Sequence, residues 1–325
     1  MTRRWGAIAA ASALALGLAA CAPTAEEPTD DGAATEWPEE IVLGLVPSQE
    51  VDQLVLDAEV LGDLLSEELG ITVRAEVTDS YNALVVAMQS GQAAIGMFGP
   101  IALVQAADQA GAEPILQSVR FGSSTYVTQW FTNDPDRFCE TEVVLDEDGF
   151  AFCNGVLDAE SGPVGESALA LIEQDEAISF VDEGSASGYY YPATQLEEAG
   201  LDPFALSGSF FAGGHPNSVL SVARGDATVG VSFNDARGNV VEELPTVGED
   251  VVVFAWSTAI PNDGVAVAGD LPQDLKDAIT EAFLAIADSE EGLAALDAVY
   301  SIEGLVPADL DALDAARQVE ANFGE

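Results

Sequence analysis

The fold is decided by the stretch IVLGLVPSQEVDQLVLDAEVLGDLLSEELGITVRAEV, residues 41–77. An apolar run over 41–46 ends at a proline, and apolar residues then recur at helical spacing until Gly70. Over 71–77 apolar and other residues alternate, as they do in a strand with one buried face. The stretch therefore predicts a strand, a helix and a second strand.

The same alternation continues further along the chain. The pattern predicts a helix over 81–89 that is closed by Gly91, a strand over 94–98, a helix over 100–111 that starts at a proline, and a strand over 115–119. Strands that alternate with helices of this length predict a parallel sheet with helices on both faces.

A second region repeats the pattern. A strand is expected to end near Phe180, followed by a helix up to Gly200, an extended segment over 205–211 and a helix from about Pro216. Two short sequences support a duplication: GQAAIG starts at Gly91 and GDATVG starts at Gly225, and each follows an apolar helix and leads into a strand. This echo predicts two related α/β units.

The length of the folded part favours two lobes over one core. About 285 residues follow residue 40, and the chain ends in three expected helices, 273–288, 291–299 and 308–323, that would pack back onto the first lobe. We therefore expect an α/β fold with a ligand cleft between two lobes. The expected boundaries are 40–128 and 256–325 for lobe one and 129–255 for lobe two.

Two glycine-rich turns are candidates for binding an anion. GSASGY, residues 184–189, lies between an expected strand and an expected helix, where backbone N–H groups and serine hydroxyls can bind an anion without a cation. GGHPNS, residues 213–218, repeats this design and places the only histidine of the chain at a helix start. The alternatives are a turn that only caps its helix and a histidine with a structural role.

Four motifs in order carry a resemblance to a known family. GSASGYYYP (184–192), GGH with NSV (213–219), RGDA (224–227) and TAIPND (258–263) resemble the phosphonate/phosphite-binding proteins of ABC transporters, a class II periplasmic-binding-protein family. The similarity covers about residues 40–288. It implies an importer's binding protein, not an enzyme, that captures a small phosphorus oxyanion, uses no cofactor and has a membrane permease as its partner.

The resemblance also implies a set of ligand-binding residues. The serine-rich loop falls on Ser185, Ala186 and Ser187, the histidine on His215, the cleft acids on Asp235 and Asp263, and the first-lobe aromatic residues on Tyr81 and Tyr126. Alanine stands at 186 where the family often has a hydroxyl residue, so a backbone N–H or water would replace one donor. A carboxylate beside such a ligand would accept a P–OH proton or hold an ammonium group, as on 2-aminoethylphosphonate, whereas the alternative is a solvated surface acid.

The N-terminal residues predict export and lipidation. MTRRW is followed by an apolar run over 6–20 that is too short to span a bilayer comfortably, and LAAC, residues 18–21, resembles a bacterial lipobox. We expect 1–21 to be a lipoprotein signal peptide with lipidation at Cys21 and 22–39 to be an acidic tether. The protein would then sit on the outer face of the cell membrane, or in the periplasm of a cell with an outer membrane.

The charge balance excludes some partners. The chain has 57 acidic and 9 basic residues, and loss of Arg3 and Arg4 with the signal leaves 57 minus 7, or about −50. Nucleic acid is a poor partner for such a surface. With Lys276 as the only lysine, the composition resembles a halophilic surface, because molar salt shortens the Debye length to ~3 Å. We expect a monomer.

The remaining cysteines, Cys139 and Cys153, are expected to form a disulfide in an oxidising compartment, in preference to two free thiols. A single histidine argues against a zinc site.

The sequence leaves two other functions to consider. A secreted hydrolase would combine Ser185 or Ser187 with His215 and Asp235, but Ala186 stands at the centre of GSASG, where a nucleophile elbow needs serine. A binding protein or sensor for another solute, such as a pyrimidine or a sulfonate, would stack its ligand on the Tyr189–Tyr191 run. Against this reading, aromatic residues at the start of a helix more often serve packing.

Overall fold

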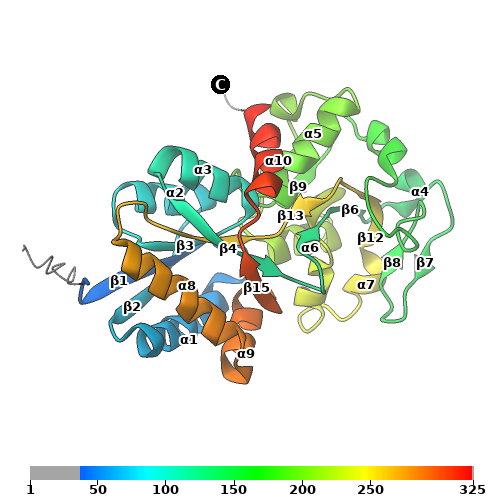
Figure 1. Cartoon of the computed structure of the whole chain (residues 1–325). Helices are drawn as coiled ribbons and strands as arrows, with labels where there is room; N and C mark the ends of the chain where they lie inside the picture. The colour runs from blue at the N-terminus through cyan, green and yellow to red at the C-terminus, as the bar shows by residue number, and fades with distance from the viewer. Residues whose placement is uncertain (1–36, 324–325) are drawn as a thin grey trace, which may run out of the picture. The chain divides into compact units, whose positions relative to one another are not determined.

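The computed structural model describes residues 37–323 (Figure 1). The predicted signal peptide, the predicted lipidation at Cys21 and most of the predicted tether lie outside the described residues. The predicted tether ends at residue 39, but Trp37 packs against the hydrophobic core of the first lobe, and its ring N–H donates to Asp274 at 3.0 Å. Within 37–323, no helix combines the length and the apolar character needed to cross a membrane.

The first lobe is built on a six-stranded sheet. Its strand order is β15-β4-β14-β3-β1-β2, with β1 Glu40–Leu45, β2 Thr72–Val77, β3 Ile95–Phe98, β4 Glu113–Val119, β14 Gly264–Val267 and β15 Gly304–Pro307. β1 runs parallel to β2 and β3, whereas β14 is antiparallel to β3 and β4. The four strands that the sequence predicted here, β1 to β4, run in the same direction as expected, but the sheet is mixed because β14 and β15, which were not predicted, are antiparallel to their neighbours. β14 starts at the cavity, where the chain returns from the second lobe, so it runs opposite to strands that end there.

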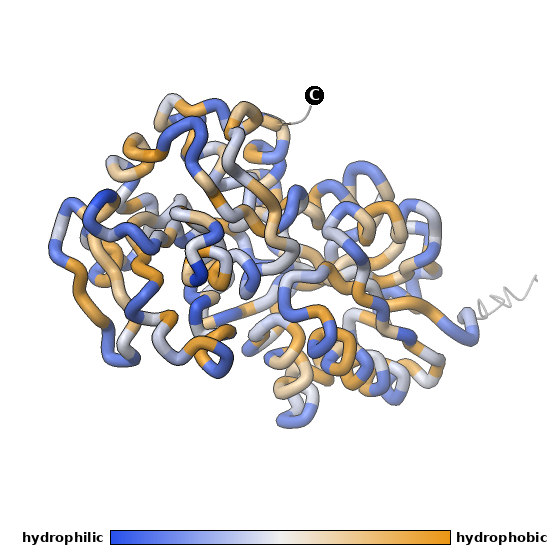
Figure 2. The backbone as a smooth tube through the Cα atoms, turned by 180° about the vertical axis from the view of Figure 1, so that it is seen from behind, coloured by the Kyte–Doolittle hydropathy of each residue, from blue (hydrophilic) through white to orange (hydrophobic). Residues whose placement is uncertain are grey.

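Helices cover both faces of this sheet and bury its apolar residues. They are α1 Val51–Leu69, α2 Tyr81–Gln89, α3 Pro100–Ala110, α8 Gln273–Ala287 and α9 Glu290–Tyr300. α1 ends at Gly70 in the left-handed conformation, as its sequence predicted, and contacts α8 and α9. Figure 2 shows hydrophobic segments inside the body and hydrophilic residues mainly at turns.

The C-terminal helix touches both lobes. α10, Leu310–Ala321, lies along α3 of the first lobe, but Phe323 just after it meets the rings of Tyr190 and Phe204 of the second lobe at 5.8 and 5.9 Å. We predicted that the last three helices pack on the first lobe. The C-terminal segment also contacts the second lobe through Phe323, which the prediction did not include.

The second lobe has a seven-stranded sheet of order β10-β9-β11-β6-β12-β8-β7. Its strands are β6 Thr128–Thr132, β7 Val144–Leu145, β8 Ala151–Phe152, β9 Ile178–Phe180, β10 Phe210–Phe211, β11 Val229–Phe233 and β12 Val252–Trp256. β9, β10 and β11 are parallel, and β6 is antiparallel to β11 and β12. This sheet is mixed as well.

The helical elements of the second lobe are mostly short. They are α4 Pro135–Phe138, α5 Tyr191–Glu198, α6 His215–Ala223 and α7 Val247–Asp250, with 3-10 turns at Glu166–Leu171, Pro203–Ala205 and Ala236–Val240. The extended segment predicted over 205–211 is only the short β10. A proline starts the 3-10 turn at 203, and Gly208 passes so close to the carbonyl of Glu176 that a side chain there would clash.

The predicted echo between the lobes is confirmed in the local backbone. Gly91 and Gly225 both have positive φ, 71° and 79°, and each ends a helix that leads into a buried strand. In both turns one helical carbonyl accepts from two successive amides: that of Ala87 in the first lobe and that of Ser221 in the second. The two lobes therefore share the same helix–turn–strand device.

The chain crosses between the lobes twice. At the crossings β5, Thr125–Tyr126, pairs antiparallel with β13, Ile260–Pro261. The predicted boundaries stay a prediction; the strands of each sheet fall in the expected ranges, except that Thr128 and Trp256 belong to the seven-stranded sheet. Cys139 and Cys153 form a disulfide in the second lobe, with their Cα atoms 5.7 Å apart.

Candidate functional site

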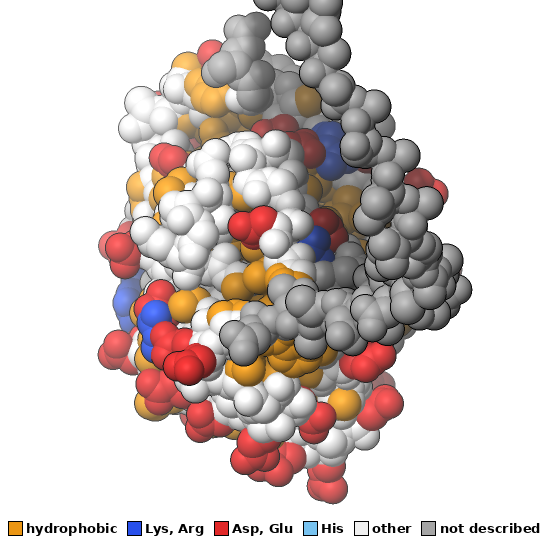
Figure 3. All heavy atoms as spheres, turned by 60° about the vertical axis from the view of Figure 1, so that its left-hand side comes forward, with side chains coloured by type: hydrophobic (Ala, Val, Ile, Leu, Met, Phe, Trp, Pro, Cys, Tyr) orange, Lys and Arg blue, Asp and Glu red, His pale blue; other side chains and the backbone are white. Residues whose placement is uncertain are grey.

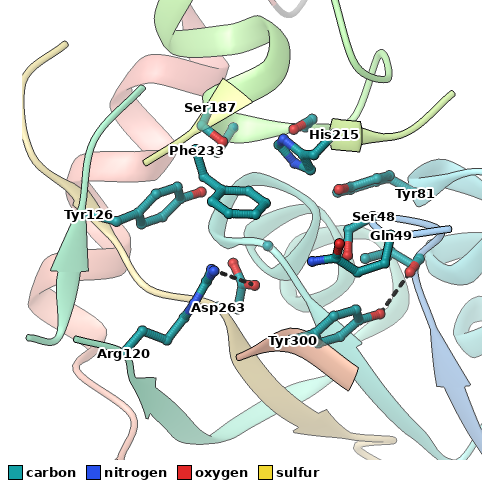
Figure 4. A pocket seen from close by; sticks show the side chains of 14 residues that line it. Ser48, Gln49, Tyr81, Arg120, Tyr126, Ser187, His215, Phe233, Asp263 and Tyr300 are labelled. Atoms are coloured by element: carbon teal, nitrogen blue, oxygen red, sulfur yellow. Dashed lines mark hydrogen bonds and ion pairs between the residues drawn. The ribbon is translucent and has the colours of Figure 1, made fainter. Parts of the chain in front are cut away.

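A small cavity lies between the two lobes at the carboxyl ends of β1, β3 and β4 (Figure 4). Its lining comes from both lobes and consists of Val46, Ser48, Gln49, Tyr81, Gly99, Arg120, Tyr126, Ser185, Ala186, Ser187, His215, Phe233, Asp263 and Tyr300. Seven of the eight ligand-binding residues expected from the sequence are among them. The eighth, Asp235, is not.

The serine-rich loop is shaped by two glycines that must lack a side chain. A Cβ atom at Gly184 would lie 2.5 Å from the Cβ atom of Tyr81, and one at Gly188 would lie 2.3 Å from the Cβ atom of Val181. The first approach brings the loop against Tyr81 of the first lobe, and the second packs it on Val181 of its own lobe. A helical segment, Ala186–Tyr190, begins in this loop and continues into α5. The hydroxyl oxygen of Ser185 accepts from the amide of Gly188 at 3.0 Å.

This helix start presents hydrogen-bond donors to the cavity. The amides of Ala186 and Ser187 belong to the first turn, where backbone N–H groups have no intrahelical acceptor. Thr128 of β6 stabilises the loop, because its hydroxyl donates to the carbonyl of Ser187 at 3.1 Å. Figure 4 shows the side chain of Ser187 directed into the space beside Tyr126. The loop can therefore donate to an anion from backbone and side chain.

His215 enters the same space from the start of α6. Its amide donates to the carbonyl of Ser48 across the lobes at 3.1 Å, and its ring Nδ1 lies 2.7 Å from the hydroxyl of Ser232. Burial, with a smaller effect of Arg120, lowers the pKa of His215 to about 3. The ring is therefore neutral at physiological pH and carries a single N–H.

Asp263 and Arg120 form the opposite wall of the cavity. Arg120 Nη1 lies 4.0 Å from Asp263 Oδ2, and the two side chains are 6 % and 20 % exposed. Burial raises the pKa of Asp263, and the positive charge of Arg120 opposes that rise. The arginine thus favours the ionised carboxylate, which can accept a proton from a ligand.

Three tyrosines complete the lining. Burial raises the pKa of Tyr81, Tyr126 and Tyr300, and the charge of Asp263 raises each further. Their hydroxyls therefore stay protonated and can donate hydrogen bonds. Tyr300 donates to the carbonyl of Val46 at 2.7 Å, which fixes its ring at the cavity.

The predicted cleft role of Asp235 does not fit its position. Its carboxylate accepts from Nε and Nη2 of Arg237 at 2.9 and 2.7 Å, and Arg237 is 1 % exposed. A buried guanidinium without a counter-charge would be costly, so Asp235 serves the interior of the second lobe.

The hydrolase triad weighed above is not assembled either. Nδ1 of His215 contacts Ser232, and the carboxylate of Asp235 is occupied by Arg237. In the range 37–323, no group of three or more His, Cys, Asp or Glu side chains is arranged to hold a metal ion.

The tyrosine run lies outside the cavity lining and packs against protein side chains. Tyr189 packs edge-on against Phe180 and Phe211, and the hydroxyl of Tyr190 accepts from Gln105 of α3 at 3.1 Å. Neither these rings nor Tyr191 line the cavity. The packing interpretation of this run is the one that agrees with the structure.

Sequence reasoning missed seven lining residues: Val46, Ser48, Gln49, Gly99, Arg120, Phe233 and Tyr300. Three of them carried a usable signal, because Ser48, Gly99 and Arg120 follow the first, third and fourth strands at the edge where ligands bind. Tyr300 ends α9, and no local pattern links that helix to the cavity.

Comparisons with known proteins agree with this geometry. The family described as "ABC transporter, phosphonate, periplasmic substrate-binding protein" matches residues 43–313. A phosphate-import protein PhnD of Mycolicibacterium smegmatis is 25 % identical over 271 residues, which are 80 % of this chain and 76 % of that protein.

Solved structures share the fold. One is a binding protein component of an ABC phosphonate transporter from Pseudomonas aeruginosa, with a TM-score of 0.70, 19 % identity, and coverage of 86 % of this chain and 85 % of that one. Another is PhnD1 of Prochlorococcus marinus in complex with methylphosphonate, with a TM-score of 0.70, 17 % identity, and coverage of 88 % and 98 %. Since the family match covers most of the described residues, the chain belongs to the family of periplasmic substrate-binding proteins of phosphonate ABC transporters.

Proposed function

We propose that the protein captures a small phosphorus oxyanion, a phosphonate, phosphite or phosphate, in the interlobe cavity and delivers it to an ABC permease. The observation that carries this proposal is the convergence of the Ser185–Ser187 loop and His215 on one enclosed space. The first turn of the Ala186–Tyr190 segment supplies backbone amides there, and the start of α6 supplies the His215 ring, an arrangement suited to an anion.

The negative Asp263 favours a protonated oxyanion over a fully deprotonated one. A ligand monoanion with one P–OH group can donate that proton to the carboxylate while its other oxygens accept from Ser187 and His215. Sulfate at neutral pH has no proton to donate, so it would place an oxygen lone pair against the carboxylate. The relatives named above, one for phosphate import and one in complex with methylphosphonate, support this ligand class.

We further propose that a lipid on Cys21 tethers the protein outside the cell membrane and that its surface is adapted to high salt. Figure 3 shows acidic side chains widely spread on one face and few basic ones, in keeping with the 57 acidic and 9 basic residues of the chain. Metabolic labelling with a palmitate analogue tests the anchor: Cys21→Ala should abolish the label, and a label that persists would refute lipidation at this residue.

Titration calorimetry in molar KCl tests the ligand class. Phosphite, methylphosphonate and phosphate are compared with sulfate as a control of similar size. We expect the protein to bind at least one phosphorus oxyanion and to bind sulfate at least ~100-fold more weakly, a difference of about 2.7 kcal/mol. Equal affinity for sulfate would contradict the role given to Asp263. No binding of any phosphorus oxyanion would overturn the proposed function.

A further inference from the structure

Arg120 is a buried cation to which the proposed function gives no direct contact with the ligand. It follows β4 at the cavity edge, is 6 % exposed, and places its guanidinium carbon 4.8 Å from the ring centre of Phe233. His215 packs against the same phenyl ring, and its ring centre lies 4.6 Å from that of Phe233. One phenyl ring therefore spaces two potential anion-binding groups along the same cavity.

Within residues 37–323, the Arg120 guanidinium is not fully hydrogen-bonded. In the part of the chain that the structure describes, Nε is buried and has no acceptor. Nη1 lies 4.0 Å from Asp263 Oδ2, which is longer than a hydrogen bond. Buried donors without partners are rare and destabilising, and they commonly mark a place where a ligand or an ion binds.

A purely structural role for Arg120 would produce a different geometry. Arg237, which is also buried, holds the carboxylate of Asp235 through Nε and Nη2 at 2.9 and 2.7 Å and donates through Nη1 to three backbone carbonyls. Arg120 also has a carboxylate nearby, that of Asp263, but it does not form a pair of hydrogen bonds with it. The difference indicates that its donors are directed at something other than the neighbouring acid.

We infer that Arg120 binds an oxygen of the ligand and, by pairing its positive charge with the negative charge of Asp263, selects oxyanions that carry no amine; this inference rests on the proposed function. A ligand with an ammonium group needs a free carboxylate, and here it would meet the arginine charge beside that carboxylate. The cavity is small, with a volume of about 20 Å³, which favours a compact ligand. The ligand class is thus phosphite, phosphate or a short alkylphosphonate.

Calorimetry on the full mature chain tests this with methylphosphonate, phosphite and 2-aminoethylphosphonate in molar KCl. Arg120→Gln removes the charge, and Arg120→Met does so while keeping the stem against Phe233, in case the first variant folds poorly. Arg224→Gln is the matched control, because it removes one exposed positive charge outside the cavity lining.

The parent should prefer methylphosphonate over 2-aminoethylphosphonate. Both Arg120 variants should bind methylphosphonate and phosphite roughly ten- to a hundredfold more weakly, as expected for loss of a charge-assisted hydrogen bond, and the preference should shrink at least ~10-fold. The control should bind like the parent. A parent that prefers the aminophosphonate, or Arg120 variants with parental affinities, would overturn the inference alone, whereas a parent that binds none of the three would overturn the proposed function.

Discussion

The Nδ1 atom of His215 lies 2.7 Å from the hydroxyl oxygen of Ser232, within the second lobe. Because burial keeps this ring neutral, the contact decides which nitrogen carries the single proton. If Ser232 donates its hydroxyl proton to Nδ1, the ring proton stays on Nε2 and can be donated to an oxyanion. Ser232 does not line the cavity, so it acts on the ligand only through the histidine.

Ser232→Ala should therefore weaken oxyanion binding by roughly tenfold, because the tautomer of His215 is no longer fixed. Ser218→Ala is the matched control: this buried hydroxyl of the same lobe donates to the carbonyls of Ser179 and Val231, whereas Nδ1 of His215 is bonded to Ser232. The control should lose about 1 kcal/mol of unfolding free energy and keep its affinity. Equal affinities of both variants, measured by calorimetry, would speak against the positioning role.

Ser187→Ala should lower the affinity for the best phosphorus oxyanion by about ten- to a hundredfold, since a hydrogen bond to a charged group is worth ~1.5–3 kcal/mol. Ser185→Ala should also lose stability, because the Ser185 hydroxyl accepts from the amide of Gly188. Affinity from calorimetry and unfolding free energy from urea titration separate the two effects. Parental affinity of Ser187→Ala would remove its hydroxyl from the site.

The pH dependence of stability should report the burial of His215. Its pKa is about 3 in the folded protein against an ordinary value of 6.5, so below pH 6.5 the unfolded chain binds a proton that the folded chain does not. The contribution of His215 to the unfolding free energy should thus be complete above pH 6.5. It should fall by up to ~1.4 kcal/mol per pH unit as the pH drops toward 3.

His215→Gln isolates this effect, because His215 is the only histidine in the chain. Asp263, whose pKa is raised by burial, has the opposite dependence, but it is present in both proteins. Urea unfolding at pH 6.5, 5.5 and 4.5 should therefore show the parent losing stability faster than the variant. Parallel curves would mean that the histidine ring is protonated in the folded state.

The disulfide should contribute to stability and not to binding. Cys139 and Cys153 are 14 residues apart and outside the cavity lining. Loss of a bridge across a loop of this size should cost about 3 kcal/mol. The double variant Cys139→Ser/Cys153→Ser should unfold at lower urea concentration and bind the oxyanion like the parent; a large loss of affinity would show that this segment shapes the site.

Much of the fold could be predicted because hydrophobic periodicity is local. α1 ends at Gly70 and α2 spans 81–89 as the spacing of their apolar residues indicated. Strand direction is not encoded in that periodicity, so the antiparallel β14 was missed: its orientation depends on where the chain re-enters the first lobe. The short β10 was overestimated because Pro203 and Gly208 outweigh the apolar residues around them.

The site could be predicted only where motifs carried it. Ser187 and His215 follow glycine-rich turns that a sequence makes visible, and both line the cavity. Arg120 and Tyr300 come from elements that only the tertiary fold brings there. Asp235 was wrongly predicted to line the cavity, because a sequence position does not show which side chain a carboxylate pairs with. Arg237, two residues later, was a candidate partner, and it binds this carboxylate.

A crystal structure of the protein with its tightest phosphorus oxyanion tests the central claim most directly. We predict density for the ligand between the lobes, with one oxygen at about 2.5–3.0 Å from the hydroxyl of Ser187 and another within hydrogen-bonding distance of the His215 ring. A ligand bound outside this cavity, or inside it without contact to Ser187 and His215, would contradict the account.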